Sequence, residues 1–202
     1  GAIKWVGRYI DLTNGHTSTE LRSAYLLLGK ASLASGKPEQ ACKALRYALA
    51  GQLSKKEYME AISNLVETYA RQQQFVEALG VLEAVRSWEL SAKEHVVISL
   101  LKAKMYRAMG LIGKAVTALG DKAEYLSDPE LKVRVSLELA QCHAAEGNFQ
   151  HSYNELSELM TLVEPGALAQ EVTLELAEVC LKINRSRQAV STCLQLLAGA
   201  AG

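Results

Sequence analysis

The feature that most constrains the fold is a period of 37 residues that recurs five times. Residues typical of a helix end stand at this spacing, namely Gly36, Gln73, Gly110, Gly147 and Asn184. Five positions after each of them the residue is small: Ala41, Ala78, Ala115, Ser152 and Ala189. Nine positions after each of them the residue is apolar: Leu45, Leu82, Leu119, Leu156 and Cys193. Such a period indicates repeats that bury their apolar faces by stacking on their neighbours.

The starts of the repeats keep the same phase. The first three begin with a capping box, in which a hydroxyl residue and a glutamate three positions later bond each other's backbone N–H groups. These boxes run from Thr17 to Glu20, from Ser54 to Glu57 and from Ser91 to Glu94. In the fourth repeat the box from Ser127 to Glu130 stands one residue out of phase. The fifth repeat has no box, and Pro165-Gly166 provides its break.

Between these marks each repeat contains two amphipathic segments, which predicts a helical hairpin. The first helices are expected over 18–35, 55–72, 92–109, 129–146 and 166–183. The second helices are expected over 38–51, 75–88, 112–125, 149–163 and 186–198. Five repeats then occupy 17–53, 54–90, 91–127, 128–164 and 165–201. Residues 1–16 carry Ile3, Val6 and Ile10 at helical spacing, which suggests the second helix of a truncated preceding repeat.

Composition and charge favour an all-α chain and exclude several classes. The 31 Leu and 28 Ala outnumber three Pro and two Phe, and Leu and Ala are strong helix formers. No apolar run approaches the roughly 18 residues of a spanning helix. Lys and Arg balance Asp and Glu at 22 each, so no global charge draws the chain to nucleic acid or an anionic membrane. The Gly-Ala start suggests a fragment without its targeting signals.

The residues at these repeating positions resemble the sequence pattern of the tetratricopeptide repeat (TPR) family. That family has a small residue late in the first helix, a Tyr three later, a Gly-like turn, and small and bulky residues along the second helix. The second repeat supplies Val66, Tyr69, Gln73, Ala78, Leu82 and Val85. The third supplies Ala103, Tyr106, Gly110, Ala115, Leu119 and Lys122. The chain departs in its period, which is 37 residues and not the family's 34, and in lacking the early Trp and the closing Pro.

The resemblance implies a right-handed α-solenoid whose first helices line a concave, partner-binding groove. The residues expected in that groove are Leu26, Lys30, Asn64, Glu67, Arg71, Leu100, Lys104, Arg107, Leu137, Glu138, Gln141, Glu171, Leu174, Glu175 and Glu178. Four of them form a leucine column, which could be an apolar stripe for a peptide or helix, or core if the register is off by one. The charged ones could also be ordinary solvated positions. Lys30 and Asn64 alone approach the carboxylate clamp of some TPR domains.

An acidic block is the sharper charge feature. From Val135 to Leu181 there are eight acidic residues and no Lys or Arg. Glu171, Glu175 and Glu178 share one helix face, where like charges repel. The block indicates a pocket for a Lys/Arg-rich partner, or complementarity to a neighbouring repeat, or a surface accident. It also interrupts the continuous basic groove that nucleic-acid binding would need.

The sequence offers no reaction centre. His16, His95, His143 and His151 stand too far apart to indicate a metal or catalytic cluster, and His143 takes the column of Tyr69 and Tyr106, so a packing role is favoured. The four cysteines form no CxxC pair, which argues against a zinc site. Four free thiols in apolar helical surroundings favour a reducing compartment and so a cytoplasmic location. Cys180 and Cys193 could lie close together, and we expect them to be reduced. No phosphate loop or hydrolase motif occurs, so no enzyme, metal or cofactor is predicted.

These observations predict a non-catalytic protein–protein interaction scaffold, a TPR segment of a longer protein that binds a peptide or helix of a partner within a multi-protein assembly. The partner is a protein or peptide, and self-association through exposed repeat ends is possible. An alternative is a ligand-responsive sensor segment that controls an attached effector domain.

Overall fold

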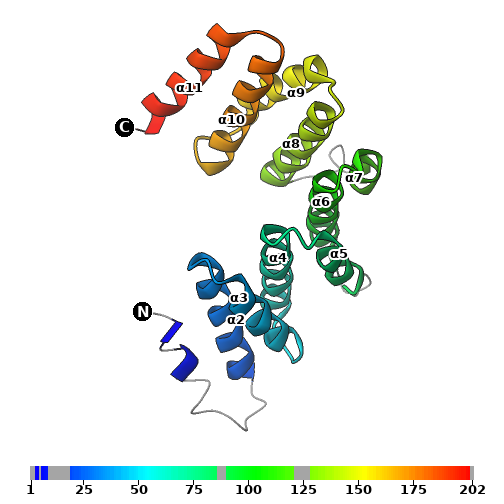
Figure 1. Cartoon of the computed structure of the whole chain (residues 1–202), viewed down its shortest axis with the longest axis vertical. Helices are drawn as coiled ribbons and strands as arrows, with labels where there is room; N and C mark the ends of the chain where they lie inside the picture. The colour runs from blue at the N-terminus through cyan, green and yellow to red at the C-terminus, as the bar shows by residue number, and fades with distance from the viewer. Residues whose placement is uncertain (1–2, 5, 9–18, 86–89, 121–127, 201–202) are drawn as a thin grey trace. The chain divides into compact units, whose positions relative to one another are not determined.

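The computed structural model of the chain describes residues 3–4, 6–8, 19–85, 90–120 and 128–200, and every element in these ranges is an α-helix. Figure 1 shows these helices as successive antiparallel pairs. The chain divides into two compact units, residues 1–90 and 91–202. The first unit holds α2 (Thr19–Ala34), α3 (Pro38–Leu49), α4 (Lys55–Arg71) and α5 (Phe75–Glu83). The second holds α6 (Ala92–Ala108), α7 (Ile112–Leu119), α8 (Pro129–Ala145), α9 (Phe149–Leu162), α10 (Ala167–Lys182) and α11 (Ser186–Ala200).

The five predicted turn residues all end a first helix in the left-handed conformation. Their φ angles are 66° at Gly36, 58° at Gln73, 73° at Gly110, 84° at Gly147 and 59° at Asn184. Each turn is a Schellman motif, in which the N–H of the turn residue and the N–H of the residue after it donate to carbonyls of the last helical turn. At Gly147, for example, Gly147 N bonds Ala144 O at 3.0 Å and Asn148 N bonds His143 O at 2.9 Å. The hairpin phase predicted from the sequence is therefore confirmed, including its unusual Gln73.

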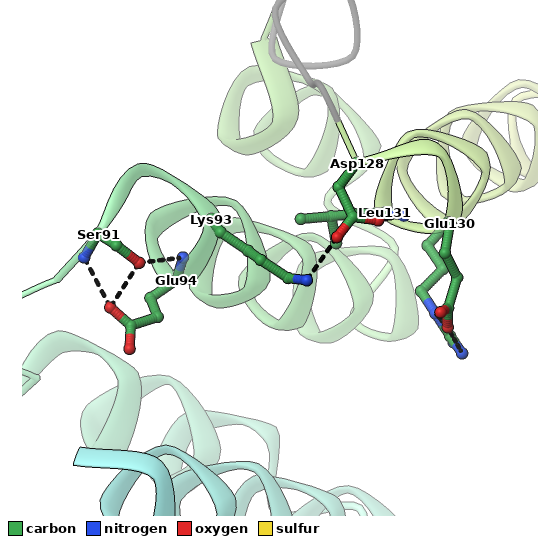
Figure 2. A network of polar contacts seen from close by, with 7 residues as sticks. Ser91, Lys93, Glu94, Asp128, Glu130 and Leu131 are labelled. Carbon is green, nitrogen blue, oxygen red and sulfur yellow. Dashed lines mark hydrogen bonds and ion pairs between the residues drawn. The ribbon is translucent and has the colours of Figure 1, made fainter.

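The helix starts confirm the capping boxes of the second and third repeats and correct that of the fourth, while Thr17 of the first box lies outside the described residues. Ser54 with Glu57, and Ser91 with Glu94, make both reciprocal bonds of the box. In the fourth repeat the cap is Asp128, whose side chain accepts from Leu131 N at 3.0 Å, so the start is in phase after all. The Pro that follows Asp128 occupies the first helical turn, where a missing N–H costs nothing. Figure 2 shows the box at the start of α6 and Lys93 reaching across to Asp128 at the start of α8.

The core of each unit follows the periodic columns. The small column at the second helices is buried throughout, from Ala41 to Ala189, because the two helices of a hairpin approach each other there. The bulky column is buried at Leu45, Leu82, Leu119 and Leu156 and half-buried at Cys193. On the first helices Gly29 belongs to a similar small column: an added Cβ would lie 2.5 Å from Leu45 Cγ. This approach explains why the residue at this position has no side chain.

Two second helices are shorter than predicted. Helix α5 ends at Glu83 and α7 at Leu119, whereas the sequence predicted helices to 88 and 125. Gly120, at φ 51°, follows α7, and residues 86–88 and 121–125 of the expected segments lie outside the described residues. At the other end Ile3 and Val6 are helical and pack against the cluster around Ala24, Leu28 and Ala44. No helix of the described ranges is long and apolar enough to cross a membrane.

Candidate binding surface

The leucine column is core in three of its four places. Leu26 is 4% exposed, Leu100 7% and Leu137 3%. Of the two alternatives that the sequence left open, an exposed stripe or core, core holds for these three, because a first helix turns this column toward its neighbouring repeat. Leu100 packs in one cluster with Leu131 and Val135 of α8. Leu174 differs, with 53% of its surface exposed on α10.

In the first unit the polar and charged groove residues of the prediction have bonding partners within the unit. Lys30 of α2 forms an ion pair with Glu60 of α4, and both side chains are about two-fifths exposed. Asn64 donates its side-chain amide to Glu60 O at 2.7 Å. Glu67 pairs with Arg71 one turn further along α4, with both side chains about half exposed. The two clamp-like residues, Lys30 and Asn64, thus both have partners inside the unit.

In the second unit four predicted groove residues form a polar ladder, which we define as Arg107, Glu138, Gln141 and Glu175. Arg107 of α6 donates hydrogen bonds to both carboxylate oxygens of Glu138 on α8, with Nε 2.7 Å from Oε1 and Nη2 3.1 Å from Oε2. The same Nη2 donates to Gln141 Oε1 at 2.8 Å. Gln141 Nε2 then donates to Glu175 Oε2 on α10 at 2.7 Å. The ladder therefore joins the first helices of three successive repeats.

The ladder holds a buried charge. Glu138 is 1% exposed, whereas Arg107 is 29% exposed. Burial works to lower the pKa of Arg107, but the hydrogen bond and negative charge of Glu138 outweigh it, and the pKa is raised. Arg107 stands in a column that is otherwise apolar, with Leu33, Ala70, Ala144 and Leu181 in the other repeats. A lone arginine in an apolar column is the sequence signal from which a buried acidic partner for Arg107 could have been predicted.

The acidic block does not form one continuous acidic surface. Glu138 and Glu175 belong to the ladder, so two of the eight carboxylates are engaged between repeats. Glu171 and Glu178 of α10 are exposed, and among the described residues neither has an ion-pair partner. Lys104 is half-buried and lines a small depression with Arg134 and Glu171.

Exposed apolar side chains gather on the outer face of the last hairpin. We call this the end face and define it by Leu174 and Leu181 of α10 and Val190 and Leu194 of α11. Each of the four is between 53% and 59% exposed. They surround a shallow depression of about 360 Å³ whose lining also includes Ala177, Glu178, Ala189 and Cys193. Of the predicted groove residues, Leu174 and Glu178 belong to this surface.

Two histidines that sequence reasoning kept apart lie together. His143 of α8 and His151 of α9 meet edge to face, with ring centroids 4.5 Å apart. Glu155 joins them, with Oε1 3.7 Å from His143 Nε2 and 3.5 Å from His151 Nε2. Burial raises the pKa of Glu155, although the two imidazoles work against that rise. The prediction that the histidines are too scattered to cluster is therefore wrong for this pair, since the Gly147 turn folds α9 back along α8.

Within the described ranges, no other histidine or cysteine joins these three residues in a possible metal-binding group. His95 is exposed on α6, and His16 lies outside the described residues. All four cysteines are free thiols. Cys180 is buried and Cys193 packs against the same core cluster, so the two share a neighbourhood as expected. Burial raises the pKa of Cys142 to about 11, so this thiol is protonated and unreactive at neutral pH.

Solved structures share this architecture. No protein-family model matches the chain, and no curated protein matches its sequence. The TPR protein TTC0263 from Thermus thermophilus superposes with a TM-score of 0.69 at 18% identity, covering 89% of this chain and 92% of that one. The TPR-like repeats of a putative kinesin light chain from Podosopora anserina give 0.64 at 22%, covering 93% and 97%.

A Rap protein complexed with Competence and Sporulation Factor gives a TM-score of 0.76 at 15% identity. This chain is covered over 96% of its length but spans only 58% of that protein. The chain is thus an all-α solenoid protein with the fold of tetratricopeptide repeat proteins, as the repeat columns predicted. A fold of this kind is a scaffold on which many functions are built, so the particular function must come from the surfaces described above.

Proposed function

We propose that the chain is a non-catalytic protein–protein interaction scaffold whose end face binds an amphipathic helix of a partner. The observation that supports this proposal is the apolar patch of Leu174, Leu181, Val190 and Leu194, which no described residue covers. Monomeric proteins seldom expose contiguous apolar surface without using it for binding. The proposed contact thus lies on α10 and α11. The resemblance to TPR proteins had instead suggested a groove along all five first helices.

The form of the partner follows from the repeats themselves. Leu100 and Leu137 occupy the same column as Leu174, and each is covered by the first helix of the next repeat. Leu137 shares its cluster with Val172 and Leu176 of α10, for example. The end face therefore has the shape that accepts a helix with an apolar stripe, whether it comes from a partner protein, a second copy or a further repeat of a longer chain.

The charge of the partner follows from the rim. Glu171 and Glu178 lie one turn to either side of Leu174 on α10, and both are exposed. No Lys or Arg occurs between Val135 and Leu181, and the basic residues that line a depression with Glu171, Lys104 and Arg134, come from the preceding first helices. A helix with Lys or Arg beside its apolar stripe would complement both features, with the charges contributing mainly to selectivity and association rate. Glu175 is engaged in the polar ladder and is left out of the proposed contact.

The test is capture of partners with the immobilised chain, followed by affinity measurements with the recombinant partner segments recovered. The variant Leu174→Glu with Val190→Glu places charge in the patch, and Glu171→Gln with Glu178→Gln removes the rim charge. Leu162→Glu is the matched control, because Leu162 is 66% exposed on α9 and lies outside the patch. We expect the first variant to abolish binding, the second to weaken it and reduce its salt dependence, and the control to bind as the unaltered chain does.

Two results would redirect the proposal. Concentration-dependent dimerisation that Leu174→Glu abolishes, measured by sedimentation, would identify a second copy as the occupant. Partners that bind all three variants equally would show that the end face is not the recognition surface.

A further inference from the structure

We propose that His143, His151 and Glu155 form a binding site for a divalent transition-metal ion such as Zn²⁺, which links α8 to α9. The three side chains each offer one ligand atom, and these atoms lie within 4.8 Å of one another. Two imidazole nitrogens and one carboxylate oxygen are a ligand set that Zn²⁺ accepts, with a fourth position left to water. The proposal does not depend on the end face, which lies on α10 and α11.

The spacing of the ligand atoms matches a metal better than a hydrogen bond. Glu155 Oε1 is 3.7 Å from His143 Nε2 and 3.5 Å from His151 Nε2. A hydrogen bond between such groups would measure about 2.7–3.2 Å. In a tetrahedral zinc site with bonds of about 2.0–2.2 Å, neighbouring ligand atoms are about 3.3–3.5 Å apart. The two imidazole nitrogens lie within 4.8 Å of each other, so an ion at the centre would draw the two imidazoles closer together.

The carboxylate of Glu155 is poorly satisfied without an ion. Its Oε2 is buried and has no hydrogen-bond partner, although buried carboxylate oxygens in proteins are normally bonded. The carboxylate therefore lacks the hydrogen bonds that would offset the cost of burying Oε2 if Glu155 served only to stabilise the fold. A metal ion would provide it, since it neutralises the charge that burial disfavours.

The local fold brings the ligands together at little cost. His151 and Glu155 are one turn apart, so both lie on the same face of α9. His143 lies in the last turn of α8, and its carbonyl accepts the bond from Asn148 N that closes the Gly147 turn. The backbone that carries all three side chains is thus fixed by helical bonds and by the Schellman turn, which leaves mainly side-chain entropy to be lost on binding.

The experiment is calorimetric titration of the metal-stripped chain with ZnCl₂, with NMR of the imidazole nitrogens as the second measurement. His151→Ala and Glu155→Gln remove ligands, and His151 is exposed, so the fold should tolerate its loss. The matched controls are His95→Ala, an exposed histidine on α6, and Glu158→Gln, an exposed glutamate on α9. We expect one ion per chain, a loss of about tenfold or more in affinity for each ligand variant, and no change for the controls.

A stability comparison separates a metal site from a structural cluster. Without metal, Glu155→Gln should unfold at the same temperature as the unaltered chain or higher, since it removes the charge of a half-buried carboxylate whose Oε2 has no hydrogen-bond partner. Saturating Zn²⁺ should raise the unfolding temperature of the unaltered chain by about 5 °C and leave the variant unchanged.

Co²⁺ is a second probe, because coordination by a thiolate gives an intense charge-transfer absorption that imidazole and carboxylate ligands do not. A thiolate band, equal zinc affinity in His151→Ala and the unaltered chain, or no binding at millimolar zinc would each overturn the proposal. Binding of Mg²⁺ as strong as that of Zn²⁺ would also overturn it, because Mg²⁺ prefers an all-oxygen site.

Discussion

The two units connect their neighbouring first helices by the same kinds of residue in different environments. In residues 1–90 the charged contact between repeats is Lys30 with Glu60, and water reaches both side chains. In residues 91–202 Lys93 with Asp128 is another exposed contact of this kind, whereas in Arg107 with Glu138 the carboxylate is almost fully buried. An exposed ion pair contributes little to stability, whereas breaking a buried pair leaves an uncompensated charge. The comparison teaches that burial, and not the presence of an ion pair, decides which repeat contact is critical.

Removing Arg107 should have the largest effect. In Arg107→Met the buried Glu138 keeps its charge but loses its bidentate partner, so we expect a loss of about 3–5 kcal/mol in unfolding free energy. Urea denaturation measures it. The double variant Arg107→Met with Glu138→Met should recover most of that loss, because two apolar side chains suit the interface. A loss below about 1 kcal/mol in the single variant would contradict the contrast between the units.

Adding a side chain at Gly29, where α2 lies close to Leu45, should have the second-largest effect. In Gly29→Ala the new Cβ would collide with Leu45, which is fully buried, and overpacking of this kind costs about 1–3 kcal/mol. Better helix propensity offsets about 1 kcal/mol of that, so a net loss of about 1–2 kcal/mol is expected by urea denaturation. In the second unit the column holds alanine, and Ala140→Gly should also destabilise, by about 1 kcal/mol. If Gly29→Ala and Ala140→Gly both destabilise the fold, the distance between the paired helices at this column differs between the two repeats.

Removing Lys30 should have a small effect. Lys30→Met leaves Glu60 accessible to water, so the expected change is about 0–1 kcal/mol in unfolding free energy and should shrink further in high salt. The same urea titration that measures Arg107→Met checks it. A change as large as that of Arg107→Met would show that the Lys30 contact is worth more than its exposure suggests.

The smallest effect concerns the helix starts, and it should appear only in acid. Hydrogen bonding from Lys93, and then from Leu131 N, lowers the pKa of Asp128, and hydrogen bonds from Ser23 and Ser54 lower that of Glu57. A lowered pKa means that the carboxylate stabilises the fold above its unfolded-state pKa, about 4, and that this contribution is lost as pH falls through the folded-state value.

Unfolding temperature measured against pH tests this in both units. Asp128→Asn keeps a good N-cap but removes the charge, so its curve should be flatter than that of the unaltered chain below about pH 4. Glu57→Gln should behave in the same way in the first unit. Parallel acid limbs for the variants and the unaltered chain would show that these carboxylates do not contribute.

The sequence predicted the hairpins well because their signals are local. A residue such as Gly147 or Asn184 adopts the left-handed conformation through bonds to carbonyls three to five residues earlier. Ser54 and Ser91 cap their helices through a glutamate three positions on. The columns around Ala41 and Leu45 were also readable, since five repeats of the same length placed them in one phase. The misplaced cap at Ser127 was an error of one residue within the same kind of signal.

The surfaces were predicted less well, because they depend on residues about one repeat apart. The amphipathic pattern shows that a first helix has an apolar side, but it does not distinguish the side facing its own hairpin from the side facing the next repeat. Leu100 and Leu137 were therefore assigned to a groove and proved to be core. For Glu138 the sequence left open an acidic pocket or complementarity to a neighbouring repeat, and the second holds, since Glu138 is the buried partner of Arg107.

The sequence by itself thus determined the number of hairpins, their turns and their phase, because each depends on bonds within a few residues. Only the tertiary structure decided that Arg107, Glu138, Gln141 and Glu175 form a ladder, that Leu174 stays exposed, and that His143 meets His151 and Glu155. These outcomes depend on how far one helix is rotated and shifted against another. That geometry arises from side-chain packing summed over the whole interface, and no single residue type records it.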